Sequence, residues 1–523
     1  MMNKRKLPIG GIQTFSELRK DYDVYVDKTA HIYNMCSRYK TVFLSRPRRF
    51  GKSLLCSTIA SLFRNEKELF NDLEISKTNW KWQEHPVIHI DLSLENFTKD
   101  NGVEALIDTI NAQLDNTCKI YGISTSESDF IGSRFTHIIS ELSLKLNNVV
   151  IIIDEYDNPL LSTINQKEIN SKLREQLKGF FSIIKGLDKY IRFSFITGVT
   201  KFAQVSVFSG MNQAKDISMM SEYSDICGIT QDELETYFEP EIDIYAEKHG
   251  GKENYLEKLR NYYNGYYFTR EKVAVYNTYG LLNHFDNSAE FTPFWSITGA
   301  PSFLIKYMEM KDVNIVEIEE AQMKARDFGD YIDNTITLFP LLYQAGYLTI
   351  SDYDEKTDLY KLNYPNVEVR QTLAYFFANN YSKAEEKFNN SVSIQLVKSL
   401  LENKPDDFMT LLVNYLNKVD YSLSSKITEY YFEFAVSNII NMLGLRCCNE
   451  VHTANGRMDS VIFAGDYIYI MEYKIDKPVE DALFQIEDKD YASIYSNSGK
   501  NIIKIGIIFS REKRNIIEWK VNN

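Results

Sequence analysis

Residues 41–53 read TVFLSRPRRFGKS, an apolar run followed by an arginine-rich loop and Gly51-Lys52-Ser53. The run Thr41–Leu44 is typical of a buried strand, and Ser53–Phe63 has the pattern of a helix. Gly-Lys-Ser at a strand-to-helix turn is the second half of a P-loop, whose amides and helix N-terminus bind phosphate. This predicts a nucleotide site over 49–54, with Lys52 on the β- and γ-phosphates and the Ser53 hydroxyl on Mg²⁺.

The motif is incomplete, because Arg46 stands where a standard P-loop has its first glycine. An ordinary helix N-terminus with a surface lysine would give the same tripeptide. Arg46, Arg48 and Arg49 surround the loop and would add positive charge there, contact another subunit or pair with acids. No arginine finger can be assigned. The nucleotide-binding residues predicted here are Arg49, Phe50, Gly51, Lys52, Ser53 and Leu54.

A second segment, VVIIIDE at 149–155, is a strand that ends in two carboxylates, as a Walker B segment does. We expect Asp154 to bind Mg²⁺ and Glu155 to polarise the attacking water. A buried strand capped by solvated acids is the alternative. The order of the two segments and their separation of about 100 residues favour a P-loop ATPase.

Two further strands end in polar residues. Thr197 follows Phe193–Ile196 and is predicted to carry a hydroxyl that contacts the γ-phosphate or the water, with a helix cap as the alternative. Asp91, within Val87–Leu92, is a weaker site candidate. These runs alternate with helical patterns at Gly102–Asn116 and Asn170–Ile184, which indicates βαβ units and a parallel sheet.

Farther along the chain the pattern changes. Helical periodicity dominates from about 230 to 335, including Gln231–Phe238 and Tyr255–Tyr263. The pattern then suggests a winged-helix-like order of helix, strand, turn and strand. The helix is Leu338–Gln344, and the two strands, on either side of a polar turn, are Gly346–Ser351 and Leu359–Leu362. Residues 371–415 have an amphipathic helical pattern, and a long helix, Lys426–Leu443, precedes a separate C-terminal α/β unit.

That unit carries a second constellation. Asp459 opens the strand Ser460–Phe463, and Glu472-x-Lys474 closes Tyr467–Tyr473. Period two puts Glu472 and Lys474 on one face, and a hairpin would bring Asp459 beside them. Two carboxylates can hold Mg²⁺, while a lysine can orient water and stabilise charge on phosphate. This predicts phosphodiester hydrolysis.

Other residues would complete this site. Glu429, on the preceding helix, would add an acidic group near the metal, and Gln485 and Tyr491 would line the same cleft. The alternative is a solvated strand face with an ion pair. A nuclease-like fold without cleavage activity is a further option.

Composition restricts the functional classes. The chain has 523 residues, a formal net charge of -13 and a pI of about 5.3, which argues against a surface coated in basic residues but does not exclude a local basic groove. Its six cysteines and seven histidines show no zinc or disulfide spacing, so we expect reduced thiols and a cytoplasmic protein. We expect neither a signal peptide at the N-terminus nor a membrane span.

The chain resembles the bacterial AAA-ATPase-like family with a C-terminal PD-(D/E)XK nuclease-superfamily domain. The resemblance runs nearly end to end. Its marks are Leu7–Gly10, Tyr25–Thr29, Arg46–Ser53, Asp154–Asp157, Ile196–Val199, Tyr263–Tyr266, Tyr276-Asn277, Gly299–Leu304, Gly456–Asp459 and Glu472–Lys474.

This resemblance implies an ATP-binding AAA-like domain over 1–229, a helical lid region over 230–335, a winged-helix-like and helical linker region over 336–415, and a nuclease-like domain over 416–523. It implies ATP and Mg²⁺ as cofactors and places Tyr25–Thr29 beside the adenine. Arg46 is shared by this family's form of the P-loop. Because AAA-type sites often form between subunits, a homo-oligomer is an option.

Three functions are consistent with these features. In the first, ATP binding and hydrolysis control a metal-dependent nuclease that cuts DNA, or less favourably RNA. Asp459, Glu472 and Lys474 would act in catalysis, with Asp459 and Glu472 also as metal ligands. In the second, the chain is an ATP-dependent switch or scaffold that binds nucleic acid or protein without cutting, through a basic face at Lys474, Lys477 and Lys489. In the third, it is a protein-interaction ATPase with no nucleic-acid role.

Overall fold

The computed structural model describes residues 5–98, 101–125, 128, 130–201, 214–295, 321–328, 338–373, 390–416, 436, 440, 445–453, 456–496, 498–513 and 515–522. The chain divides into two compact units, Met1–Glu368 and Val369–Asn523. Both are mixed α/β, as predicted from the sequence. The finer division into four regions remains a prediction.

The first unit is built on a parallel sheet of five strands in the order β2-β3-β4-β1-β5. The strands are β1 (Thr41–Ser45), β2 (Val87–Asp91), β3 (Val149–Asp154), β4 (Ile191–Gly198) and β5 (Lys215–Asp216). The four strands predicted from apolar runs are all present. Because β4 lies between β1 and β3, the P-loop and the acidic pair leave the same edge of the sheet one strand apart.

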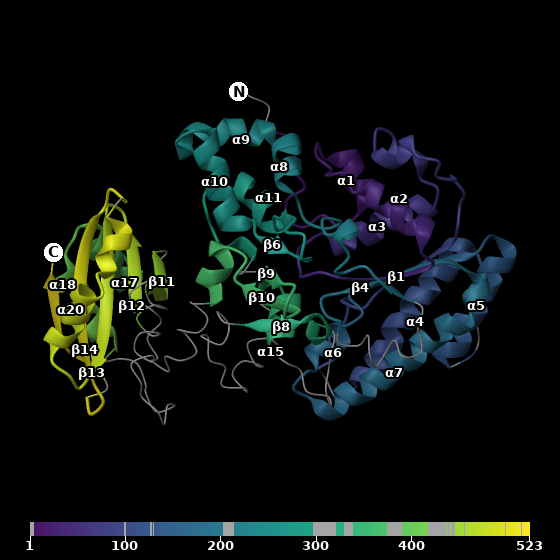
Figure 1. Ribbon diagram of the computed structural model, residues 1–523. Coiled ribbons are helices and arrows are strands. Elements are labelled where there is room, and N and C mark those ends of the chain that lie inside the picture. Colours follow the sequence, from purple (N-terminus) through teal and green to yellow (C-terminus); the bar gives the residue numbers. More distant parts are fainter. Residues whose placement is uncertain are drawn as a thin grey trace. The chain divides into compact units, whose positions relative to one another are not determined.

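Helices cover both faces of this sheet (Figure 1). One face packs against α4 (Gly102–Tyr121), α5 (Ile131–Lys145) and α7 (Lys167–Gly186) in a large apolar core that includes Ile151 and Ile153 of β3. The alternate residues Ile152 and Asp154 therefore face the opposite side, where α3 (Lys52–Phe63) packs against β3. The short helices α1 (Phe15–Asp21), α2 (Thr29–Arg38) and α6 (Asn158–Ser162) complete this part.

Residues 231–286, which lie within the region of about 230–335 predicted to be helical, contain four α-helices. The helices α8 (Gln231–Tyr237), α9 (Glu239–Ala246), α10 (Lys252–Tyr263) and α11 (Thr278–Asp286) share a core with Leu7 and Val24 from the N-terminal segment. A capping box at Thr230 and Glu233 begins α8. The strands β6 (Tyr266–Tyr267) and β7 (Ala274–Val275) pair beside these helices.

The predicted order of helix, strand, turn and strand is present after residue 337. It consists of α15 (Leu338–Gln344), β9 (Thr349–Asp354) and β10 (Leu359–Asn363), with β8 (Gln322–Lys324) on the free edge of β10. Ordinary alternation explains β10, in which Tyr360 and Leu362 are buried and Leu359, Lys361 and Asn363 are partly or fully exposed.

The second unit holds a mixed five-stranded sheet in the order β11-β12-β13-β14-β15. Its strands are β11 (Arg446–Thr453), β12 (Gly456–Ala464), β13 (Tyr467–Ile475), β14 (Asn501–Ser510) and β15 (Asn515–Asn522), and its helices are α17 (Asn390–Leu401), α18 (Pro405–Leu416) and α20 (Val479–Asp488). The connection through α20 makes β13 and β14 parallel, while the other pairs are antiparallel.

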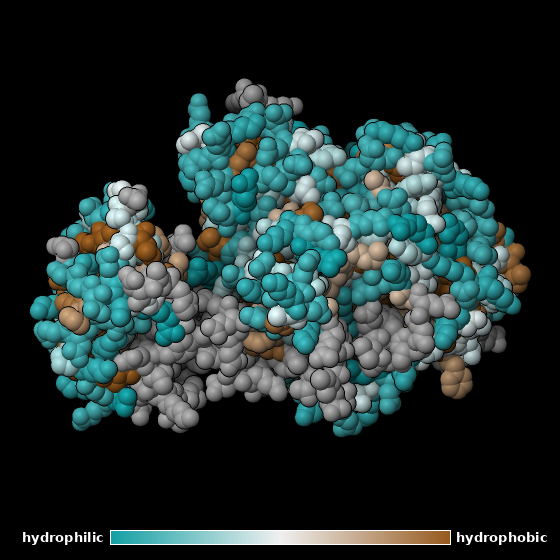
Figure 2. Space-filling view, in the orientation of Figure 1, coloured by the Kyte–Doolittle hydropathy of each residue, from teal (hydrophilic) through white to brown (hydrophobic). Residues whose placement is uncertain are grey.

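The visible surface is mostly hydrophilic, and apolar residues appear on it in small separate groups (Figure 2). Among the described residues, no helix is both long enough and apolar enough to cross a bilayer. The expected helix Lys426–Leu443 lies outside the described residues except for Val436 and Ile440, which are buried in the core of the second unit.

Candidate functional site

The loop between β1 and α3 has its carbonyl groups held on the outside. The Trp295 indole N–H donates to the Arg48 carbonyl at 3.1 Å, and the Asn277 amide donates to the Arg49 carbonyl at 3.4 Å. The Gly228 amide donates to the Phe50 carbonyl at 3.2 Å. In a planar trans peptide the carbonyl and the following N–H point in opposite directions. The amides of residues 49–51 therefore point away from these donors.

These amides form a concave row of donors. The backbone is left-handed at Arg49, with φ of 70°, and at Gly51, with φ of 90°. Within the described part of the chain, no acceptor contacts the amides of residues 49–54. Successive free N–H groups at the start of a helix make an anion-binding site. The geometry of the whole segment, Arg49–Leu54, fits a phosphate chain.

Side chains of both predicted segments meet beside these amides. Lys52 is 3% exposed, and its Nζ lies 3.3 Å from Glu155 Oε1 and 3.1 Å from the Pro47 carbonyl oxygen. The Ser53 hydroxyl lies near the Asp154 carboxylate and lowers the pKa of that group. The lysine, the hydroxyl and both acids thus share one site at the end of the sheet.

Burial dominates the electrostatics of the two acids. Burial, and then the neighbouring Glu155 charge, raise the pKa of Asp154 to about 7, against the lowering effects of Ser53 and Lys52. Glu155 has a φ of 50°, and its amide donates to Asp154 Oδ1 at 2.9 Å. A left-handed glutamate at a strand end is uncommon and occurs at functional sites. A hydroxyl and a carboxylate suit Mg²⁺, which prefers oxygen ligands.

An apolar cavity of about 80 Å³ lies next to the P-loop. It is lined by Phe50, Gly51 and Leu54, and across from them by Tyr25, Val26 and Lys28 of the segment expected near adenine. Residues 226–229 and the beginning of α11 close it. The mostly apolar lining suits the face of a flat base. Asp27 and Thr29 of the expected segment do not line this cavity. The Asp27 carboxylate accepts the amides of Thr29 and Glu74, and the Thr29 hydroxyl accepts the amide of Ile75.

In the second unit, β12 and β13 form the predicted hairpin. Ser460 pairs with Met471, so Asp459 and Glu472 lie opposite each other one position further along. The Tyr473 amide donates to Asp459 Oδ2 at 2.8 Å, and Lys474 Nζ donates to Glu472 Oε1 at 2.9 Å. The structure therefore brings the two acids and the lysine together.

Glu472 is fully buried, and its Oε2 atom has no hydrogen-bond partner among the described residues. Burial, and then the charge of Asp459, raise the pKa of Glu472 to about 7. An unpartnered carboxylate oxygen beside a second carboxylate is costly unless a cation is present. These two side chains fit a divalent metal ion.

Comparison with known proteins supports both domain families. Residues 8–208 match the family model described as "Predicted AAA-ATPase", and residues 427–519 match that of the "PD-(D/E)XK nuclease superfamily". A protein of Azotobacter chroococcum mcd 1, "Uncharacterized protein in vnfD 5'region", is 33% identical to this chain over 541 aligned residues. The alignment covers 100% of both chains. The chain belongs to this AAA-ATPase-like family.

Other residues predicted for the AAA-ATPase-like site have different positions. The Thr197 hydroxyl is fully buried and donates to the Leu44 carbonyl at 2.9 Å, so it does not extend beyond the strand end toward phosphate. Arg46 is 1% exposed and donates to the carbonyls of Ser45, Ser218 and Tyr223. Its guanidinium therefore anchors the loop through buried backbone carbonyls and does not add exposed positive charge around the loop. Asp91 pairs in register with Asp154, and its side chain accepts the Ser93 amide.

Sequence reasoning missed several residues that shape the AAA-ATPase-like site. Asp157 is fully buried and accepts the amides of Val199 and Thr200 and the Thr200 hydroxyl, which ties the end of β3 to the end of β4. Asn277 and Trp295 hold the loop carbonyls. Asp157 and Asn277 stand in strings that mark the family, but no local pattern reveals the carbonyl partner of Trp295.

Around the nuclease-like site, the Tyr491 hydroxyl donates to the Arg457 carbonyl at 2.6 Å, and Gln485 lies 3.5 Å from that hydroxyl. This pair is thereby fixed next to the beginning of β12, two residues from Asp459. Lys477 is exposed, and Lys489 pairs with Asp488 at 3.4 Å. Glu429, predicted as a third acidic group, lies outside the described residues.

Proposed function

We propose that the first unit binds ATP with Mg²⁺ and hydrolyses it. The observation that carries this proposal is the row of unpartnered amides at 49–54, which faces Lys52 and the acids Asp154 and Glu155. The apolar cavity beside Phe50 and Leu54 supports a purine base as the other end of the ligand. A P-loop that bound only phosphate would not need such a cavity.

The residues would act in sequence. Lys52 moves from Glu155 and the Pro47 carbonyl to the phosphate oxygens, where it stabilises negative charge. Ser53 and Asp154 would hold Mg²⁺, which when bound neutralises charge on the β- and γ-phosphates. Glu155, released from Lys52, then orients a water molecule and accepts its proton.

We further propose that the second unit is a metal-dependent phosphodiesterase acting on DNA in preference to RNA. Asp459 and Glu472 would hold the divalent ion, which supplies electrostatic stabilisation of the phosphate. Lys474 shares the cluster and would orient the attacking water once its bond to Glu472 Oε1 is given up. The proposal extends to control, in which the nucleotide state of the first unit sets the cleavage rate of the second.

The test is cleavage of labelled single- and double-stranded DNA by the full chain with Mg²⁺ or Mn²⁺, with and without ATP. We expect cleavage that requires metal and is abolished by Asp459→Ala, while ATP turnover continues in that variant. Asp466→Ala, in the exposed turn of the same hairpin, is a matched control. Loss of both activities in Asp459→Ala would indicate misfolding or a shared site.

A different outcome would favour the switch or scaffold function. If the chain never cuts but binds DNA with an affinity that falls with salt and with mutation of Lys474, Lys477 and Lys489, the second unit is a binding module. ATP affinity that is unchanged in Lys52→Ala would overturn the nucleotide assignment itself.

A further inference from the structure

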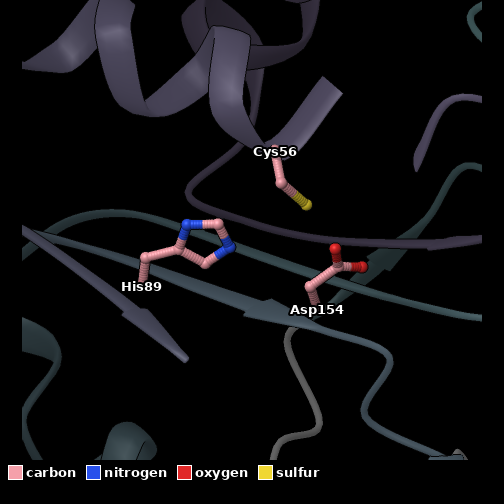
Figure 3. A group of neighbouring side chains, drawn as sticks. All are labelled: Cys56, His89 and Asp154. Atoms are coloured by element: carbon pink, nitrogen blue, oxygen red, sulfur yellow. The ribbon is translucent and has the colours of Figure 1, made fainter. Parts of the chain in front are cut away.

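Two side chains with no role above converge on Asp154 from beneath the nucleotide site. Cys56 of α3, His89 of β2 and Asp154 of β3 each offer one ligand atom, and these three atoms all lie within 4.8 Å of one another. Figure 3 shows the thiol, a ring nitrogen and the carboxylate directed toward one shared space. Three elements far apart in the sequence thus contribute one possible metal ligand each.

The fold explains why they meet. Asp91 pairs with Asp154 and His89 with Ile152, so His89 and Asp154 project from the same face of the sheet on adjacent strands. Helix α3 packs on that face. Cys56 lies about one turn after Ser53 and faces the sheet, where it is fully buried.

The histidine carries an independent sign of a missing ligand. Its Nε2 atom is buried and has no hydrogen-bond partner in the described part of the chain. Buried side-chain nitrogens are nearly always paired in folded proteins. A histidine that served only to fill the core would be expected to bond to a carbonyl, as His85 does through its Nδ1 to the Asn148 carbonyl at 2.8 Å.

We propose that Cys56, His89 and Asp154 form a site for a thiophilic divalent cation of the zinc class. Thiolate, imidazole and carboxylate are ligands that Zn²⁺ accepts, and three protein ligands leave a fourth position for water. Mg²⁺ does not favour sulfur or nitrogen ligands, so the ligand set discriminates between the two ions. On binding, a metal–sulfur bond forms and the thiol proton is released to solvent.

The consequence for catalysis rests on the proposed ATPase function. Asp154 belongs both to this site and to the Mg²⁺ site with Ser53. An ion held by Cys56 and His89 would engage the Asp154 carboxylate and take it from Mg²⁺. Zinc would therefore inhibit ATP turnover without occupying the phosphate-binding amides.

The first test uses Co²⁺ as a spectroscopic probe on the metal-free full chain without nucleotide. We expect about one equivalent to produce a thiolate-to-cobalt charge-transfer band, which Zn²⁺ then removes. Cys56→Ser should abolish the band, and His89→Gln should weaken Co²⁺ binding about 10- to 100-fold or more. Cys118→Ser, at another buried cysteine, should leave it unchanged.

No sulfur band, or an equal band in Cys56→Ser, would overturn the metal site. His89→Gln gives a second decision through its Co²⁺ binding constant, independent of how well Cys56→Ser folds. Zinc inhibition of ATP turnover is then measured for each variant relative to its own zinc-free rate. A cobalt band in a chain that never hydrolyses ATP would support the site and contradict only the proposed function. Turnover insensitive to zinc, with no cobalt band, would contradict only the inference.

Discussion

At the scale of single residues, the two charged groups expected to act in catalysis neutralise each other. Lys52 and Glu155 are paired at 3.3 Å, and Lys52 is almost fully buried. A buried lysine without its partner is costly. Nucleotide binding would therefore exchange one anion for another, with phosphate replacing the glutamate.

This exchange predicts different effects for the two partners. Glu155→Gln removes the competing anion and the proton acceptor, so ATP affinity should be maintained or rise while turnover falls by about 10²- to 10⁴-fold. Binding titrations with a fluorescent ATP analogue and a phosphate-release assay separate the two effects. Glu175→Gln, on an exposed part of α7, is the control. A loss of affinity as large as the loss of turnover would contradict the assignment.

A pH dependence follows from Glu472. Its pKa is raised to about 7, so in the metal-free protein this carboxyl is largely protonated at pH 6. A metal ion must displace that proton, and affinity should fall by up to about tenfold per pH unit below pH 7 and level off above it. Mn²⁺ titrations between pH 5.5 and 8.5 would measure this. An affinity independent of pH would mean that Glu472 is not a ligand.

At the scale of elements, the P-loop is shaped by segments outside it. Gly346 has a φ of 87°, and a Cβ there would lie 2.8 Å from Pro47 Cβ, so a side chain at this position would press on the loop. The donors to the loop carbonyls come from Gly228, from Asn277 at the N-terminus of α11 and from Trp295.

Trp295→Phe tests this support. The substitution keeps an aromatic ring but removes the N–H donor to the Arg48 carbonyl. A lost hydrogen bond of about 1 kcal/mol would weaken ATP binding about fivefold. Trp519→Phe removes a comparable indole hydrogen bond, to Asp406 in the second unit, and should leave ATP affinity unchanged. Equal affinity in both variants would show that the indole does not position the loop.

The junction of β3 and β4 gives a stability prediction. A Cβ at Gly198 would lie 2.4 Å from Asp157 Oδ1 and 2.6 Å from Tyr156 Cδ1. Gly198→Ala should therefore lower the free energy of unfolding by about 1–3 kcal/mol. At Gly186, at the end of α7, a Cβ would meet no heavy atom within 4 Å, so Gly186→Ala should be neutral or stabilising. Denaturant titration compares the two, and equal stability would refute the crowding argument.

Elements were predictable from sequence where one pattern determines them. The apolar run at 149–153 is buried on both faces, so β3 was evident. Strands β11 and β15 escaped prediction because RCCNEVHT and NIIEWKVN mix polar and apolar residues without a clear run.

Lys52, Ser53 and Asp154 of the candidate site were predicted from local motifs. Trp295 was not, because its hydrogen-bond partner is 247 residues away. The same holds for the group of Cys56, His89 and Asp154, which only the register of β2 and β3 reveals.

At the scale of the whole molecule, two units of different chemistry share one chain. The first unit contains every residue of the proposed nucleotide site, and the second contains Asp459, Glu472 and Lys474. Each site can therefore be inactivated without touching the other. The proposed communication between them would require the full chain, and the ATP dependence of DNA cleavage would measure it.

The outward-facing carbonyls of the P-loop have a consequence for biosynthesis. The groups that fix this loop arise from positions 228, 277, 295 and 346, so about 300 residues must be translated after Gly51 before all of them exist. At elongation rates of about 5–20 residues per second, this takes roughly 15–60 s. During that interval the nascent chain contains the P-loop sequence but lacks the groups that fix the conformation of the loop. The nascent protein would thus acquire its affinity for ATP late, when most of the first unit has already emerged.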